Sequence, residues 1–214
     1  MFRKELNLLV LAAFVFVGCV KDDLEELPLK SNIITAEVEN GKNYESEFSS
    51  VKVMMDKSYY AKGRFIDIDG YYEVASSDYI DGRFSLTLSE TVESRFLVSL
   101  SDFFDCETGV KISNSSARAG GISINGYNED GVLVDDFVYH KRIDDDNSIR
   151  GNFIYVDRDV TITNADGYTT YNLNLKKGWN MYFIRDYGYG YKQNIVSSGD
   201  VLKWYRRKDF KKIE

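Results

Sequence analysis

Apolar and polar residues alternate over most of the chain beyond residue 32. In the segment 84–88, phenylalanine and leucine occupy every second position, with serine or threonine between them. The segments 160–163, 171–175 and 179–183 repeat this period of two. Successive side chains of a strand point to opposite faces, so the pattern predicts strands with one buried and one solvent-facing side.

Turn dipeptides are interspersed with these alternating segments. The chain holds six Asn-Gly or Asp-Gly pairs, and both types tolerate the positive φ angles of a two-residue hairpin turn. The sequence therefore predicts a series of antiparallel hairpins. The predicted strands are 33–39, 48–56, 71–77, 82–88, 110–113, 119–127, 131–140, 149–157, 159–164, 168–175, 179–186 and 200–206.

One segment departs from the period of two. Val92, Phe96 and Leu100 recur at helical spacing after Ser89, which predicts one short helix near 90–100. The fold class expected is all-β: an antiparallel β-sandwich or barrel of about 10–12 strands. We expect residues 32–214 to form a single domain, with a possible subdivision near 90–106.

Composition narrows the function classes. The chain has 214 residues with a net charge of −7, so it is a poor candidate for binding nucleic-acid phosphates. One histidine and two cysteines leave no histidine cluster for a metal ion and allow one disulfide at most. The sequence gives no reason to expect a metal or another cofactor, and we expect a protein that is not an enzyme.

The first 18 residues form a distinct segment. Arg3 and Lys4 precede an apolar run over 6–17, which is interrupted only by Asn7. A run of about twelve residues is short for a membrane-spanning helix, whereas a basic start before a short apolar run is typical of a secretory signal. We therefore expect residues 1–18 to be a signal peptide.

The residues that follow carry a more specific pattern. Residues 16–19, Phe-Val-Gly-Cys, resemble a bacterial lipobox, in which a small residue precedes the cysteine that is lipidated. Lys21 and the acidic residues after it are similar to the export signal of Bacteroidota-type surface lipoproteins. The resemblance implies a lipid on Cys19, attachment to the outer membrane and exposure at the cell surface, with residues 19–31 as a flexible tether. A periplasm-facing lipoprotein is the alternative.

Tyr187, Tyr189 and Tyr191 alternate with glycine and form the strongest candidate binding site in the sequence. In an extended strand these side chains would point the same way, about 7 Å apart. Such a row could stack on sugar rings or hold a peptide. The alternative is a structural role, either as a loop or as tyrosines that cover glycines across a hairpin.

Other candidate groups have weaker patterns. Asp144–Asn147 gathers oxygen ligands of the type calcium prefers but lacks the spacing of a calcium-binding loop, so we interpret it as an acidic hairpin loop. His140 lacks a nucleophile motif and is interpreted as a strand-end histidine. Cys106 lies among acidic residues and is interpreted as a small buried apolar residue. Six cations over 203–212 suggest either contact with lipid phosphates or an acidic partner, or a solvated last strand.

These features favour a non-catalytic binding or adhesion module for a glycan, a peptide or an envelope partner. A lipocalin-like barrel that carries a small apolar ligand is one alternative. A hydrolase with two carboxyl groups about 5–10 Å apart in a cleft is another. A purely structural role in the envelope is the third.

Overall fold

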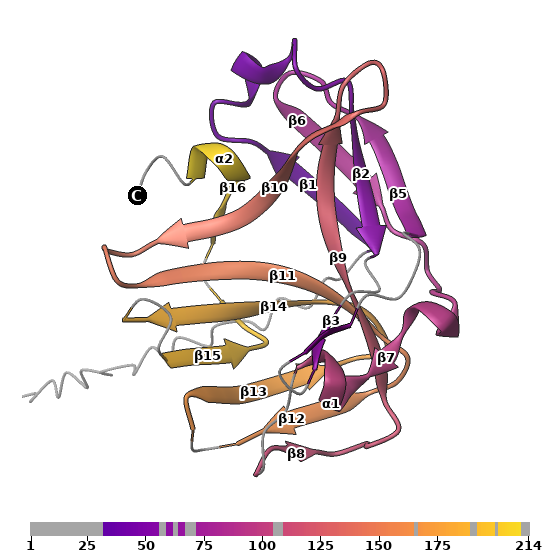
Figure 1. Ribbon diagram of the computed structural model, residues 1–214, viewed down its shortest axis with the longest axis vertical. Helices are drawn as coiled ribbons and strands as arrows, with labels where there is room; N and C mark the ends of the chain where they lie inside the picture. The colour runs from indigo at the N-terminus through magenta and orange to yellow at the C-terminus, as the bar shows by residue number, and fades with distance from the viewer. Residues whose placement is uncertain are drawn as a thin grey trace, which may run out of the picture.

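The computed structural model describes residues 32–55, 59–61, 64–66, 72–104, 109–164, 167–188, 192–199 and 201–210 (Figure 1). The lipidation site at Cys19, its tether and Cys106 lie outside these residues. The strands are β1 (Ile33–Glu37), β2 (Ser50–Met55), β3 (Tyr59–Ala61), β4 (Arg64–Ile66), β5 (Tyr72–Asp78), β6 (Arg83–Thr87), β7 (Val98–Ser99), β8 (Lys111–Ile112), β9 (Arg118–Tyr127), β10 (Leu133–Arg142), β11 (Ser148–Val156), β12 (Val160–Thr163), β13 (Thr169–Leu175), β14 (Gly178–Tyr187), β15 (Lys192–Val196) and β16 (Lys203–Arg206). The helical turns are η1 (Gly41–Tyr44), η2 (Ser94–Phe96), α1 (Leu100–Phe103) and α2 (Arg207–Phe210).

The all-β prediction is confirmed, and each of the twelve predicted segments overlaps an observed strand. The structure also decides between the two architectures, because the described residues form a sandwich and no closed barrel. The predicted helix near 90–100 is a 3₁₀ turn, η2, followed by the short helix α1. The helix α1 begins where the Ser99 side chain accepts a hydrogen bond from the Asp102 backbone N–H.

One turn signal proves to be part of a strand. The pair Asn125-Gly126 lies within β9, between β2 and β10. A Cβ on Gly126 would lie 2.5 Å from the Phe48 ring, so glycine is needed here for close packing rather than for a turn. By contrast, Asp81 and Gly82 both have positive φ and form the predicted hairpin turn.

The main sheet has the strand order β5-β2-β9-β10-β11-β14-β15-β13-β12-β8, and β1 and β6 form a separate two-stranded sheet. Strand β11 pairs with two strands in turn. Its first half pairs with β10, and its last residues pair with β9. The last long strand, β16, pairs with the other edge of β10. These pairings place β10, β11 and the C-terminal segment together, as Figure 1 shows.

Strand β15 lies between β13 and β14, parallel to β13 and antiparallel to β14. The sequence prediction missed it because Lys-Gln-Asn-Ile-Val lacks an alternating pattern. Its single deeply buried side chain, Ile195, pairs in register with Tyr171 and Ile184. The register also brings Gln193 next to Asp186 on β14, which matters for the site described below.

Buried side chains fill the two halves of the fold. One core cluster packs β1 and β6 against β2, β9 and β10 and is rich in aromatic residues, including Phe48, Phe84, Phe137 and Trp204. The other packs around β12, β13 and α1 and is mainly aliphatic. Within the described residues, no helix is long and apolar enough to cross a membrane.

Candidate functional site

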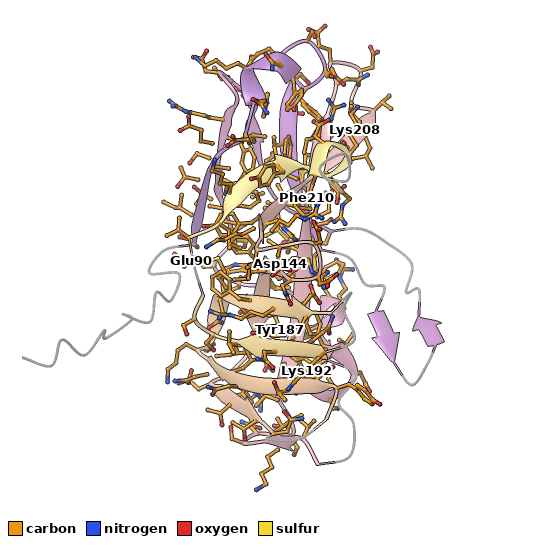
Figure 2. All side chains as sticks on the ribbon, turned by 90° about the vertical axis from the view of Figure 1, so that its left-hand side faces the viewer. Glu90, Asp144, Tyr187, Lys192, Lys208 and Phe210 are labelled. Carbon is orange, nitrogen blue, oxygen red and sulfur yellow. The ribbon has the colours of Figure 1, made fainter. Side chains whose placement is uncertain are left out.

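A cleft of about 840 Å³ lies where β10, β11, β14 and β15 meet α2. Figure 2 shows this side of the molecule, with Phe210 on one side of Asp144 and Tyr187 and Lys192 on the other. Three arginines and four aspartates line the cleft together with polar and apolar side chains, so its charges are mixed. The lining residues are Val138, His140, Arg142, Asp144, Asp145, Asp146, Asn147, Ser148, Arg150, Asp186, Gln193, Arg207 and Phe210.

Strand register builds the floor of the cleft. Ser148 on β11 lies opposite Arg142 on β10 and opposite Asp186 on β14, and Asp186 lies opposite Gln193 on β15. Partners in register point to the same face of a sheet. Four neighbouring strands therefore each contribute one polar side chain to a single row.

Hydrogen bonds join Asp186 to Gln193 within this row and to Arg150 in the neighbouring row. The Arg150 guanidinium donates to both carboxylate oxygens of Asp186, at 3.0 and 3.3 Å, and Gln193 Nε2 donates to Asp186 Oδ1 at 2.7 Å. The Asp186 side chain is 13% exposed and the Arg150 side chain 45% exposed. The carboxylate thus orients two longer side chains that face solvent, an arrangement suited to hydrogen-bonding a polar ligand.

His140 lies in the next row, directly opposite Arg150. It is 5% exposed, and its Nδ1 atom has no hydrogen-bond partner in the part of the chain that the structure describes. The Phe210 ring covers it, with 3.9 Å between the ring centroids. Burial, reinforced by the nearby Arg150 charge, lowers the His140 pKa to about 4, so the imidazole is neutral at pH 7.

The acidic loop at the cleft rim is closed by its own hydrogen bonds. Asp144 accepts from the Asn147 side chain at 2.7 and 2.8 Å and from the Asp146 backbone N–H at 2.9 Å, which lowers the pKa of the Asp144 carboxyl. Arg142 donates to Asp145 at 2.9 Å. No group of three or more potential metal ligands occurs among the described residues. The interpretation as an acidic hairpin loop fits this geometry.

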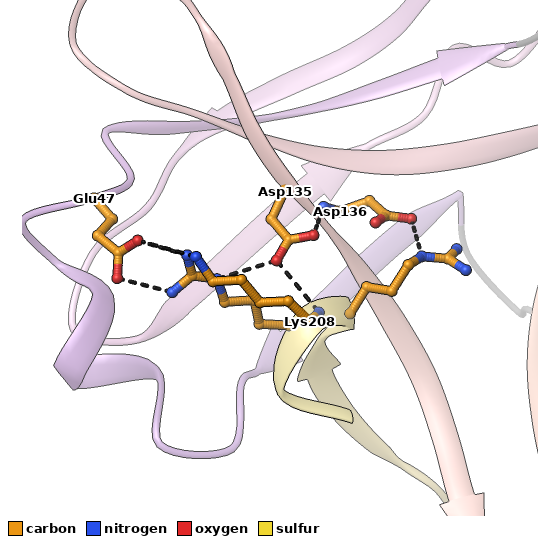
Figure 3. Close-up of polar contacts among 6 residues, drawn as sticks. Glu47, Asp135, Asp136 and Lys208 are labelled. Carbon is orange, nitrogen blue, oxygen red and sulfur yellow. Dashed lines mark hydrogen bonds and ion pairs between the residues drawn. The ribbon is translucent and has the colours of Figure 1, made fainter. Parts of the chain in front are cut away.

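The basic C-terminal segment makes contacts that the sequence did not reveal. Arg206 is 2% exposed and donates to both carboxylate oxygens of Glu47 and to Asp135. The cations on either side bond to the body as well: Lys203 to Glu39, Arg207 to Asp136, and Lys208 to Glu47. Figure 3 shows the central part of this network. Of the described cations, only Arg206 is buried, whereas Lys203, Arg207 and Lys208 bond to carboxylates of the same chain and keep about half or more of their side chains exposed.

The tyrosine row is only partly within the described residues. Tyr187 ends β14, half-buried and opposite Lys192, whereas Tyr189 and Tyr191 lie outside the described residues. Alternation along β14 directs Tyr187 to the opposite side from Asp186, and Tyr187 does not line the cleft. Sequence reasoning missed Arg150, Asp186 and Gln193 because only strand pairing brings these three residues together.

Comparisons with protein-family models, with curated proteins and with solved structures found no match to this chain.

Proposed function

We propose that this protein is a lipoprotein of the bacterial outer membrane that is displayed at the cell surface through a lipid on Cys19. Its sandwich binds a glycan, a peptide or an envelope partner without catalysing a reaction. The signal-peptide pattern and the lipobox support the anchoring part of this proposal. The cleft supports the binding part.

The single observation that carries the binding role is the group of hydrogen-bonded polar side chains on the cleft floor. Asp186 holds Arg150 and Gln193 in place; the Arg150 side chain is 45% exposed and Gln193 is half-buried. A ligand that bonds to oriented groups loses less entropy on binding than one that must order them. Such a floor favours a ligand with several hydrogen-bonding groups, as glycans and peptide backbones have.

The alternatives have less support. A lipocalin-like carrier needs a closed barrel around an apolar cavity, and the described strands form a sandwich whose interior is filled by side chains. A carboxylate-based hydrolase needs one acid with a raised pKa. In the cleft, Asp145 and Asp186 are paired with arginines, and the Asp144 pKa is lowered.

Anchoring is tested in a bacterial host that exports and lipidates proteins of this type. Labelled palmitate should enter the wild-type protein and not the Cys19→Ala variant. Protease added to intact cells should remove the folded part if it faces outward. Palmitate in the Cys19→Ala protein would contradict the lipid anchor, and protection of the folded part from protease would contradict surface display.

Binding is tested with the mature protein on glycan and peptide arrays. For any ligand found, Arg150→Ala and Gln193→Ala should each weaken binding about tenfold or more, since each removes an oriented hydrogen bond. Exposed Lys111, remote in the fold, provides the control Lys111→Ala. A triple Tyr→Ala variant at 187, 189 and 191 tests the tyrosine row separately, and unchanged binding in that variant would reject this row as the site.

A further inference from the structure

The helix α2 is a single turn that lies beside the cleft and contributes Arg207 and Phe210 to its lining. An isolated helix of this length is not stable, so contacts with the body must hold it in place. Besides a hydrogen bond between the Asp209 and Tyr44 side chains, two kinds of contact point to the type of ligand that this surface accepts.

The first kind is aromatic. The Phe210 ring packs on His140 and also lies 5.8 Å from the Tyr205 ring. His140 is 95% removed from solvent, and within the described residues its buried Nδ1 atom has no hydrogen-bond partner, which is energetically unfavourable. An aromatic side chain of a ligand would reproduce the ring contact that Phe210 makes with His140.

The second kind is electrostatic. Asp135, Asp136 and Glu47 bond to Arg207 and to the backbone and side chain of Lys208. The side chains of Arg207 and Lys208 are 52% and 49% exposed, and exposed ion pairs of this type contribute about 0–1 kcal/mol each. Residues 207–210 follow β16 and take part in no strand pairing, so α2 can leave this surface without breaking a ladder.

We propose that His140, Glu47, Asp135 and Asp136 form a binding site for a basic peptide segment that carries an aromatic residue, and that the chain's own Arg207–Phe210 segment occupies this site. The ligand would replace α2, with its cations on the carboxylates and its ring on His140. The inference deepens the proposed binding function by naming a ligand class for one end of the cleft.

The covalent attachment of α2 to β16 explains how this weakly held segment can still cover the site. A segment joined to the body by a short connection acts at an effective concentration on the order of millimolar. A free peptide with the same contacts must exceed that concentration to displace it. Removal of the Phe210 ring should therefore open the site to a peptide added in solution.

The role of the Phe210 ring as a cover over His140 can be tested without any ligand. His140 is the only histidine in the chain and gives a single imidazole signal in proton NMR. Charged or titratable groups near it come from β10 (Arg142), β11 (Arg150), β14 (Asp186), β16 (Lys203 and Tyr205) and α2 (Arg207). In Phe210→Ala all of them remain while water reaches the ring. The His140 pKa should then rise from about 4 towards its ordinary value of 6.5.

The matched control is Tyr168→Ala, which removes a ring that is 77% exposed in the loop before β13. It should leave the His140 titration unchanged. An unchanged pKa in Phe210→Ala, with the fold intact by circular dichroism, would overturn the role of Phe210 as a cover.

The ligand class is tested with a fluorescent peptide of residues 207–212, Arg-Lys-Asp-Phe-Lys-Lys. Phe210→Ala protein should bind it at least tenfold more tightly than wild type. Alanine in place of phenylalanine in the peptide should abolish binding, and so should Asp136→Asn added to Phe210→Ala. Glu129→Gln, which removes one exposed charge in the β9–β10 loop, is the charge control.

Equal binding by wild type and Phe210→Ala, or binding that does not need the peptide's ring, would overturn the proposal. The absence of peptide binding to Phe210→Ala would overturn the ligand class even if the His140 pKa rises. Because neither assay depends on Cys19 or on display at the cell surface, failure here is distinct from failure of the proposed anchoring function.

Discussion

Two buried polar side chains, Arg206 and His140, differ in whether the described structure supplies their hydrogen-bond partners. Arg206 is 2% exposed, bonds to Glu47 and Asp135, and lies over the rings of Tyr44 and Phe48 at 4.9 and 5.1 Å. His140, on the strand that pairs with β16, is 5% exposed and keeps an unpartnered Nδ1 within the described structure. The first position is fully compensated and the second is not.

Burial has different consequences for the pKa values of these two side chains. Burial alone would lower the Arg206 pKa, but its bonds to Glu47 and Asp135 raise it, so the charge is retained and joins the last strand to the body. At His140, burial prevails and the ring gives up its charge instead. Arg206 thus joins the last strand to the body through paired charges, whereas His140 stays neutral and its Nδ1 atom has no hydrogen-bond partner among the described residues.

The largest effect is expected at Arg206. Arg206→Met keeps most of the volume but removes the buried cation from the 12% exposed Asp135 and leaves Glu47 only the longer contact with Lys208. We expect a loss of about 2–4 kcal/mol in the free energy of unfolding, measured by urea denaturation. The control is Arg207→Met, one residue away and half-exposed. A loss below about 1 kcal/mol at Arg206 would remove the distinction between the two buried groups.

The pH dependence of stability tests His140. Its pKa is about 4 in the folded state and 6.5 ordinarily, so the unfolded chain takes up a proton between these values and the folded chain does not. Stability should therefore fall as pH falls from about 6.5 to about 4, by about 1–3 kcal/mol from this group.

The matched measurement uses His140→Gln, which cannot titrate. As pH falls from 7.5 to 4.5, the free energy of unfolding of wild type should decrease relative to that of His140→Gln. Carboxylates titrate in both proteins, so their contributions cancel in this difference. A pH-independent difference would show that His140 keeps an ordinary pKa.

The smallest effect is expected for the exposed part of the C-terminal segment. Arg207→Ala removes one half-exposed ion pair with Asp136 and should change the free energy of unfolding by less than about 1 kcal/mol, and less again in 0.5 M salt. A loss as large as that of Arg206→Met would mean that α2 is an integral part of the fold rather than a replaceable cover.

Alternation and turn residues were enough to predict the β fold, because both act locally along the chain. The exceptions are informative. β15 was missed because its residues lack alternation, and Asn125-Gly126 was taken for a turn signal although Phe48 packs against that glycine. Both depend on neighbours that are distant in sequence, which no local pattern encodes.

The site shows the same limit more strongly. The sequence marked His140 and the loop Asp144–Asn147 only as weak candidates, and Tyr187, the one described residue of its preferred tyrosine site, does not line the cleft. The pairing of Arg150 with Asp186 spans 36 residues, and that of Arg206 with Glu47 spans 159. Charges so far apart in the chain can be matched only when the strand order is known.

The sequence by itself thus determined the class of the fold, the positions of most strands and the expectation of a lipid anchor at Cys19, because each depends on short runs of residues. Only the tertiary structure decided that the sheet forms a sandwich, that the described C-terminal cations bond to carboxylates of the body, and that Phe210 covers a histidine whose Nδ1 atom has no hydrogen-bond partner among the described residues. Strand order and register set these contacts, and they follow from the packing of the whole chain rather than from any one segment.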